Sequence, residues 1–398
     1  MFYGLCCMRS LLGFATDRER AARLAPCKLL VVPVGTAVTV LCLLFGSFGE
    51  NARACTSFRL GGNPSSTSHV VAKSYDWDNG AGRVVTNKRG VRKSAMQLLS
   101  NTSGALTWTS RYASVTFNQY GREMPNGGMN ERGLVVEILW LTDTQYAHPD
   151  KRSELNELQW IQYQLDNFSS VTEMVSHAPF IRVAPLYAKV HYFACDANAD
   201  CATFEWLRGK LVIHLGASLP KAALANETYA ASMRFAGPHL SGDANGRTLP
   251  SGSGSNARFT RAAFASGAKT SAPPKSVANA FQHLDSVAQG DFTKWQIVYE
   301  PKSLRMHFRA RPTWVTKVVD VGALVEGASG ACDTPALQLN LGASQGGDVT
   351  KAFKPWSAKD NRKLVQESFR ALGAGALLLK PVVAQIASYP QRTRCVQK

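Results

Sequence analysis

Cys55 is the residue on which a catalytic chemistry can be built from this sequence. It directly follows Ala52-Arg53-Ala54, an A-x-A pattern of small residues that signal peptidase accepts just before its cut. Cleavage after Ala54 would make Cys55 the first residue of the mature chain. Its thiol would then be a nucleophile, and its own α-amine, with a reference pKa of about 7.7–8.0, would be a base near working pH. The plain alternative is a cysteine that lies near a cleavage site by chance.

The segment before Cys55 has the features of an export signal. Residues 29–48 form an apolar run with basic residues upstream, as in a signal peptide. We therefore expect residues 1–54 to be a cleaved leader and residues 55–398 to be one catalytic domain. The mature protein would be periplasmic or secreted, without stable membrane insertion.

Two other interpretations of the leader stay open. The apolar run is nearly long enough to span a bilayer, so it could be an uncleaved membrane anchor. Cys55 follows a small residue and could instead be lipidated, although Ala52 is a poor match to the usual Leu three positions before a lipidated cysteine.

The chain is basic, with a formal net charge of +17 from 45 Lys and Arg against 28 Asp and Glu. Such a balance suits anionic substrates or an anionic surface. The basic residues are spread along the chain, and no nucleic-acid-binding motif surrounds the densest cluster, Lys88, Arg89, Arg92 and Lys93. We interpret this cluster as a solvated strand or hairpin and expect no nucleic-acid partner.

Five of the nine cysteines follow residue 54, namely Cys55, Cys195, Cys201, Cys332 and Cys395. An odd count in an exported protein leaves one thiol free, and Cys55 is the natural candidate. Cys195 and Cys201 flank a turn-forming segment and could close a hairpin, so that Cys332 and Cys395 would pin the C-terminal tail. The alternative is four reduced, buried cysteines, as in a cytosolic protein.

The elements that must position Cys55 are mostly strands. Alternating apolar and polar residues predict strands at 56–60, 68–75, 83–86, 106–110, 113–119, 188–194, 202–208, 211–215, 295–299, 303–309 and 316–320, and an apolar run predicts a buried strand at 133–141. Helical spacing appears at 154–167, 171–177, 256–266 and 276–288. Sheets separated by helices, without a regular βαβ alternation, predict an α+β layered domain.

Several common catalytic signatures are missing from the sequence. It has no G-x-S-x-G, H-E-x-x-H, C-x-x-C or phosphate-loop motif, and its eight histidines are scattered. We therefore expect neither a metal nor an organic cofactor.

Six short patterns, in order, resemble the choloylglycine hydrolase family, which includes penicillin V acylases and conjugated bile-salt hydrolases. They are C-T-S-F at 55–58, A-K-S-Y-D-W at 72–77, G-M-N-E-R-G-L at 128–134, L-A-N-E at 224–227, N-A-R-F at 256–259, and W-Q-I-V at 295–298 followed by L-R-M-H-F at 304–308. The resemblance covers nearly all of residues 55–310. It implies the four-layer αββα sandwich of the N-terminal nucleophile hydrolases.

The resemblance also implies a role for each matched residue. Cys55 would be the nucleophile, and Asp76 would hold its amine or thiol by a charge-assisted hydrogen bond. Asn226 and the backbone N–H of Trp140 would donate to the oxyanion, and the Trp140 indole could line the acyl pocket. Arg258 would lie near the thiolate. The plain alternatives are a strand cap for Asp76, core packing for Trp140 and a surface salt bridge for Arg258.

One position departs from the pattern, because Lys73 stands where the family usually has Arg. Lysine keeps the charge but loses the planar two-pronged fork. Its cation could still lower the pKa of the Cys55 thiol. Trp77, together with Trp140, favours an aromatic or fatty acyl group over a steroid.

The predicted function is an exported hydrolase of linear amide C–N bonds, similar to penicillin V acylases and acting on a small amide with an apolar acyl group. Conjugated bile-salt hydrolysis and acyl-homoserine lactone hydrolysis are the enzymatic alternatives. A non-enzymatic, membrane-anchored binding protein with a degraded site is the third, with Lys73 as its best support. The resemblance further implies a homotetramer.

Overall fold

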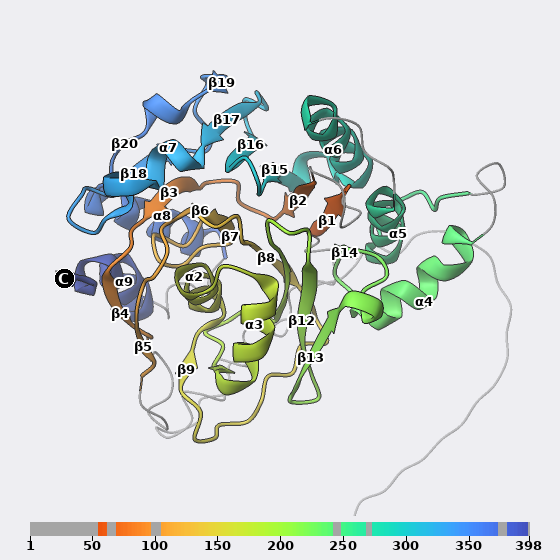
Figure 1. Ribbon diagram of the computed structural model, residues 1–398, viewed down its shortest axis with the longest axis horizontal. Helices are drawn as coiled ribbons and strands as arrows, with labels where there is room; N and C mark the ends of the chain where they lie inside the picture. The colour runs from red at the N-terminus through yellow and green to blue at the C-terminus, as the bar shows by residue number, and fades with distance from the viewer. Residues whose placement is uncertain are drawn as a thin grey trace, which may run out of the picture. The chain divides into compact units, whose positions relative to one another are not determined.

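The computed structural model describes residues 55–61, 69–96, 105–241, 248–267, 273–372 and 380–396 (Figure 1). All of them belong to one unit, Gly49–Lys398. The expected leader, residues 1–54, lies outside the described residues. No helix in the described parts of the chain combines the length and apolar composition needed to cross a bilayer.

The first sheet carries Cys55 at its N-terminal strand. Its seven strands follow the order β14 (Ala223–Leu224), β1 (Thr56–Leu60), β2 (Val70–Asp76), β15 (Thr293–Glu300), β16 (Arg305–Ala310), β17 (Lys317–Asp320) and β19 (Gly347–Asp348). Thr56 pairs with Ser74, and Ser57 pairs with both Lys73 and Leu224. The start of β1 therefore lies between the end of β2 and the segment that follows β14.

The second sheet is antiparallel throughout. Its nine strands follow the order β13 (Lys210–Leu215), β12 (Cys201–Leu207), β11 (Val190–Cys195), β8 (Val135–Trp140), β7 (Gly127–Asn130), β6 (Ser114–Asn118), β3 (Arg83–Asn87), β18 (Leu337–Asn340) and β20 (Lys354–Pro355). Its central strands are buried on both faces, as a strand between a helix layer and another sheet must be.

Helices cover the outer face of each sheet. Helices α5 (Ser255–Ser266) and α6 (Pro273–Val287) pack on the first sheet, with α4 (Tyr229–Leu240) against α5. Helices α2 (Glu157–Asn167) and α3 (Val171–His177) pack on the second sheet. Figure 1 shows α5 and α6 beside β1 and β2. The predicted α+β layered architecture, with four layers in the order αββα, is confirmed.

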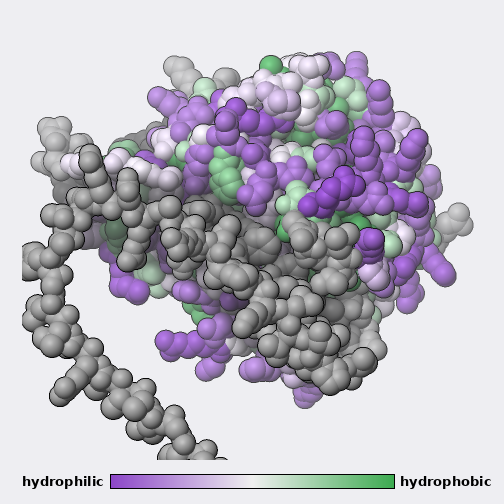
Figure 2. Space-filling view, turned by 180° about the vertical axis from the view of Figure 1, so that it is seen from behind, coloured by the Kyte–Doolittle hydropathy of each residue, from purple (hydrophilic) through white to green (hydrophobic). Residues whose placement is uncertain are grey.

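The two sheets face each other across an apolar interior. Phe117 of β6 packs edge-on against Phe308 of β16, with ring centroids 5.4 Å apart. Over the described surface in Figure 2, hydrophilic side chains predominate and hydrophobic ones are scattered. Apolar burial between the sheets is therefore what holds the layers together.

The interpretation of the basic cluster as a solvated strand was wrong for its two lysines. On β4 (Val91–Ser94), Arg92 faces solvent, but Lys93 points inward and bonds to Glu123 and Asp166 at 2.5 and 2.9 Å. Lys88 is also buried, and its ammonium donates to the carbonyl of Ser329. A buried ammonium is tolerated here because acceptors surround it.

Several elements differ from the predicted pattern. Strand β7 was not predicted, because its G-G-M-N sequence has no alternation of apolar and polar residues. The helix expected at 154–167 begins only at Glu157, because the Asn156 side chain caps α2 by accepting from two backbone N–H groups. Residues Glu154–Leu155 instead form a short strand, β9, paired with β10 (Arg182–Val183). The expected strand at 106–110 narrows to β5 (Thr107–Thr109).

The C-terminal region adds elements that the sequence did not suggest. They are α7 (Val321–Val325), α8 (Ala358–Arg370), α9 (Lys380–Ser388) and β21 (Arg394–Cys395). Strand β21 joins β4 and β5 in a three-stranded sheet. Ser357 caps α8 by accepting from the backbone N–H of Asp360.

Candidate active site

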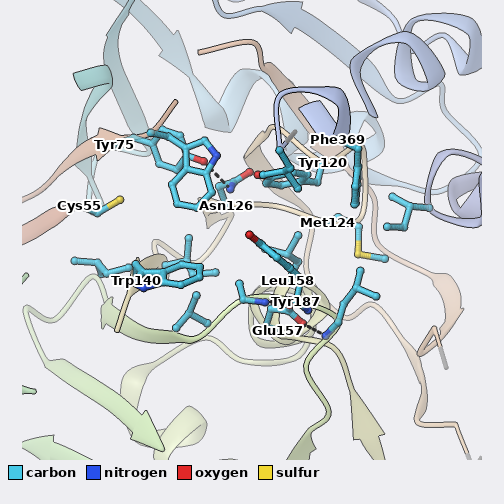
Figure 3. A pocket seen from close by; sticks show the side chains of 18 residues that line it. Cys55, Tyr75, Tyr120, Met124, Asn126, Trp140, Glu157, Leu158, Tyr187 and Phe369 are labelled. Atoms are coloured by element: carbon cyan, nitrogen blue, oxygen red, sulfur yellow. Dashed lines mark hydrogen bonds between the residues drawn. The ribbon is translucent and has the colours of Figure 1, made fainter. Parts of the chain in front are cut away.

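Cys55 lies at one end of an apolar pocket of about 730 Å3, counted to its open mouth (Figure 3). It is the free cysteine among the described residues, and its side chain is 4% exposed. It precedes β1, on the face that also carries Ser57 and therefore points between the sheets. Burial raises the pKa of the Cys55 thiol, and the nearby ammonium of Lys73 opposes that rise.

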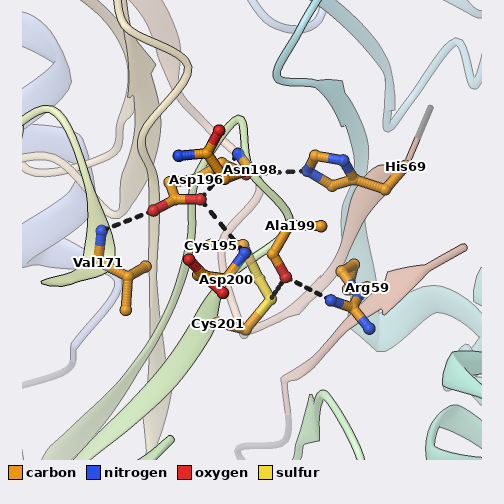
Figure 4. Close-up of a disulfide and its surroundings, with 9 residues drawn as sticks. All are labelled: Arg59, His69, Val171, Cys195, Asp196, Asn198, Ala199, Asp200 and Cys201. Atoms are coloured by element: carbon orange, nitrogen blue, oxygen red, sulfur yellow. Dashed lines mark hydrogen bonds between the residues drawn. A yellow bond between two sulfur atoms is a disulfide. The ribbon is translucent and has the colours of Figure 1, made fainter. Parts of the chain in front are cut away.

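The other four cysteines form two disulfides, Cys195–Cys201 and Cys332–Cys395. The first closes the β11–β12 hairpin (Figure 4). In the turn of this hairpin, the carboxylate of Asp196 accepts a hydrogen bond from the backbone N–H of Val171 at 2.9 Å. That bond ties the hairpin to the start of α3.

Asp76 lies at the end of β2, fully buried beside Cys55. Its backbone N–H donates to the Cys55 thiol, while its Oδ1 accepts from the hydroxyls of Ser74, at 3.1 Å, and Thr293. Burial raises the pKa of the Asp76 carboxyl, and Thr293, Arg258 and Gln289 oppose the rise. Among the described residues, Oδ2 receives no hydrogen bond of good geometry, so this buried oxygen can accept from a further donor.

Arg258 holds the site from the first turn of α5 instead of lying on the helix surface. It is 1% exposed. Its Nη1 donates to the Cys55 carbonyl at 2.8 Å and to Thr56 Oγ1 at 2.5 Å, while its Nη2 donates to Asn226 Oδ1 at 2.9 Å. The planar guanidinium thus connects the residue before β1 to the residue after β14.

Asn226 is oriented on both sides of its amide. Arg258 can only donate, so the atom that faces it must be the Asn226 oxygen. The amide nitrogen donates one hydrogen to the Trp140 carbonyl at 2.7 Å. An amide nitrogen carries two hydrogens, so the second is available for another acceptor.

Lys73 is fully buried between the two sheets. Its ammonium donates to the carbonyl of Ile138 and lies 3.6 Å from the carboxylate of Glu137, both in β8. The Tyr299 hydroxyl donates to the other Glu137 oxygen. Burial raises the pKa of Glu137 to about 7, against the lowering effects of Lys73 and Tyr299. The charge of Lys73 therefore has both a partner and an effect on Cys55.

Two residues that support Asn226 were missed from the sequence. His191 Nδ1 lies 3.0 Å from Glu205 Oε1, and its Nε2 lies 2.7 Å from the carbonyl of Ala225. Glu205 also accepts from the backbone N–H of Tyr229 at 2.9 Å. Burial raises the pKa of Glu205, but hydrogen bonds from His191 and His214 outweigh it and lower the pKa to about 2. The His191 ring thus bridges the Glu205 carboxylate and the Ala225 carbonyl, next to Asn226.

The sequence did contain a signal for the His191–Glu205 pair. A Cys195–Cys201 bridge between paired strands sets a register in which His191 stands directly opposite Glu205. Facing side chains in antiparallel strands lie within contact distance.

Aromatic rings line the pocket beside Cys55. The rings of Trp77 and Trp140 have centroids 6.0 Å apart, and Trp140 lies 6.4 Å from the ring of Tyr187. Figure 3 shows Trp140 and Tyr187 facing the cavity below Cys55 and Tyr75. The Tyr75 hydroxyl donates to Gln119 at 2.8 Å, so its polar tip is already bonded.

Within the described residues, no group of three or more His, Cys, Asp or Glu side chains is arranged to hold a metal ion. The described site offers a thiol, an amide donor and buried charges.

Comparison with known proteins identifies relatives of this chain. The sequence model of the family described as linear amide C–N hydrolases, choloylglycine hydrolase family, matches residues 55–296. A penicillin V acylase from Pectobacterium atrosepticum is 31% identical over 198 residues, which is 45% of this chain and 50% of that protein. The chain thus aligns with only half the length of this curated relative.

Two solved structures share the fold. The penicillin V acylase of Agrobacterium tumefaciens superposes with a TM-score of 0.65 at 25% identity, over 76% of this chain and 98% of that one. The conjugated bile acid hydrolase of Clostridium perfringens gives a TM-score of 0.59 at 16% identity, over 73% and 98%. The resemblance inferred from six short patterns is confirmed.

Proposed function

The chain belongs to the choloylglycine hydrolase family of linear amide C–N hydrolases, and from this premise we propose that it cleaves N-acyl amides with an apolar acyl group, as a penicillin V acylase-like enzyme. The observation that carries the proposal is the position of the Cys55 thiol. It opens on an apolar pocket, next to an oriented Asn226 amide and a buried Asp76. Two relatives named as penicillin V acylases support the same activity.

Removal of residues 1–54 completes the proposed nucleophile. The free α-amine of Cys55 takes the thiol proton, and the thiolate attacks the amide carbonyl carbon. Asp76 Oδ2, a buried carboxylate oxygen with no well-formed hydrogen bond among the described residues, suits the resulting ammonium. A charged partner there would relieve the cost of an unsatisfied buried acceptor.

The oxyanion formed by this attack accepts a hydrogen bond from the second hydrogen of Asn226 Nδ2. Arg258 and the Trp140 carbonyl keep that amide from turning. We assign a further contribution to the backbone of Trp140, as the family pattern suggests. A pre-oriented donor of this kind typically contributes a factor of about 10²–10³ to kcat.

The acyl group leaves the enzyme in two steps. The α-ammonium gives its proton to the departing amine nitrogen as the C–N bond breaks, which leaves a thioester on Cys55. Water, deprotonated by the same amine, then attacks the thioester carbonyl. The C–S bond breaks, the carboxylic acid is released, and the ammonium returns its proton to the Cys55 sulfur. No redox step or external reactant besides water enters this balance.

Export to the periplasm or outside the cell is part of the proposal. Disulfides persist in oxidising compartments, and two of them hold the described chain. The burial of Lys73 on Glu137 also favours an active enzyme over the non-enzymatic alternative, because the cation still acts on the Cys55 thiol. The homotetramer stays a prediction.

Two measurements test the proposed function together. Intact mass and N-terminal sequencing of exported protein should give a chain that begins at Cys55. Cys55→Ala should abolish hydrolysis of phenoxyacetyl and fatty-acyl amides, while Ser176→Ala, at an exposed serine outside the pocket, should retain it. Undiminished hydrolysis by Cys55→Ala, or an exported chain that begins elsewhere, would refute the mechanism.

A further inference from the structure

The far wall of the pocket comes from the end of the chain. Phe369 at the end of α8, Leu372 in the turn that follows it, and Ile386 of α9 line the same cavity as Cys55. In Figure 3, Phe369 and Cys55 lie on opposite sides of the pocket. These three residues lie beyond residues 55–296, which the family model matches. The catalytic residues and the distal wall thus come from separate parts of the sequence.

Helix α8 is held close to the pocket by a glycine. Gly121 has φ +98°, and a Cβ there would lie 2.7 Å from Val365 Cγ2 and 3.3 Å from Asn361 Oδ1. A larger residue would push α8 away. Tyr120, the neighbour of Gly121, packs its ring edge-on against Phe369 with centroids 5.5 Å apart.

Hydrogen bonds attach helices α8 and α9 to the loop that contains Gly121. Asn361 Oδ1 accepts from the backbone N–H of Arg122 at 2.8 Å, and Asn361 Nδ2 donates to the Ala387 carbonyl of α9 at 3.0 Å. Ser368 donates to the Gln119 carbonyl at 2.7 Å. One side chain, Asn361, therefore joins both helices to the loop that borders the pocket.

The chain beyond α9 is anchored as well. The Tyr389 hydroxyl donates to the Ser94 carbonyl at 2.7 Å, and β21 pairs with β4. Cys395 is bonded to Cys332. A wall held by pairing and a covalent link has a defined position, so it can discriminate between ligands by size.

The interior of the pocket offers a substrate little polar contact. The carboxylate of Glu157 accepts three backbone hydrogen bonds, from Leu186, Tyr187 and Ala188, so its charge is already satisfied. The distal residues are apolar. Burying a charged or hydroxylated group against them would cost free energy without a compensating bond.

We propose that Phe369, Leu372 and Ile386 set the length of the acyl group, so that the enzyme prefers extended, unsubstituted apolar acyl chains that end against α8 and α9. This inference rests on the proposed function, because it assigns the pocket to the acyl part of the substrate. Each additional methylene that fits gains burial, and the first that does not fit meets the wall. The selectivity therefore changes at one chain length.

The test is a series of straight-chain N-acyl p-nitroanilides, from about four to about fourteen carbons, assayed for kcat/KM. Phe369→Ala and Leu372→Ala should move the preferred length upward, changing the long-to-short kcat/KM ratio by about tenfold, the effect of burying roughly two more methylenes. Leu372→Trp should move it downward. Leu364→Ala, a buried residue of the same helix that does not line the pocket, should leave the ratio unchanged.

Binding separates this inference from the proposed function. The Cys55→Ala variant should bind the same series with a length preference that Phe369→Ala shifts, as measured by calorimetry. A shifted preference without wild-type hydrolysis would refute the function and support the wall. If wild type, Phe369→Ala and Leu372→Ala hydrolyse the series with the same length profile, the proposed role of the distal wall is overturned. The proposed amide hydrolysis would still be supported.

Discussion

The guanidinium of Arg258 donates to Asn226 Oδ1 at 2.9 Å, and this contact turns the amide nitrogen toward Trp140. Had the amide turned, its oxygen would have repelled a developing oxyanion. Arg258 also holds the Cys55 carbonyl, so a single side chain sets the spacing between the thiol and the amide donor. We regard Arg258 as a positioning residue.

Arg258→Lys should lower kcat by about 10–100-fold with little change in KM, because one ammonium cannot replace the planar fork. The exposed Arg92→Lys in β4 is the control and should retain activity. If Arg258 acts through Asn226, the same substitution should cost much less in an Asn226→Ala background. An undiminished loss there would contradict the positioning role.

Lys73→Met should make the Cys55 thiol harder to ionise. Burial already raises the pKa of this thiol, and Lys73 is the strongest opposing influence. The pH midpoint of alkylation by iodoacetamide should therefore rise by about one unit. Lys73→Arg should keep the wild-type midpoint, as should Lys317→Met, which removes a buried lysine of the same sheet. An unchanged midpoint in Lys73→Met would exclude the effect.

The raised pKa of Glu137 predicts that the folded protein loses stability as pH rises. Its pKa is raised from 4.5 to about 7, so the folded protein keeps this proton longer than the unfolded chain does. The resulting stability is complete below pH ~4.5 and disappears as pH rises through ~7, at a cost of about 3 kcal/mol. Glu137→Gln should flatten the fall in Tm across this window, whereas the exposed Glu326→Gln should keep it. Parallel Tm curves for wild type and Glu137→Gln would contradict this account.

Glu205 predicts the opposite dependence. Its pKa is lowered to about 2, so its ionised form stabilises the fold above pH ~4.5 and this stability is lost as pH falls through ~2. Urea unfolding should show Glu205→Gln less stable than wild type at neutral pH, with the difference shrinking in acid. The variant should also lose kcat, since His191 would no longer hold Ala225 as firmly. Glu300→Gln, at another histidine–glutamate pair 2.8 Å apart, is the control for both effects. A constant difference from pH ~7 to ~3 would argue against this role.

The sequence indicated which residues gather around Cys55, because they lie in short, recognisable segments; their catalytic roles stay predictions. Cys55, Asp76, Asn226 and Arg258 are far apart in the chain, and the structure brings them together around the start of β1. Local alternation was enough to predict most strands of both sheets. Such segments can be recognised without knowing what packs against them.

Features that depend on packing partners were not predicted. Lys93 looked solvated because the acids that bind it, Glu123 and Asp166, belong to other elements. Helix α8 buries Asn361 and Ser368 together with Leu364, Val365 and Phe369 at helical spacing on one face, so its amphipathic pattern was present in the sequence and was missed. Only tertiary contacts explain why these polar residues face inward.

The same separation along the chain has an evolutionary consequence. Since the thiol and its supporting charges precede residue 297 while the distal wall follows residue 357, the two can diverge independently. Exchanging the last forty or so residues between relatives would transplant a preference for chain size onto an unaltered reaction centre, provided that the recipient keeps a glycine where the incoming helix touches the loop.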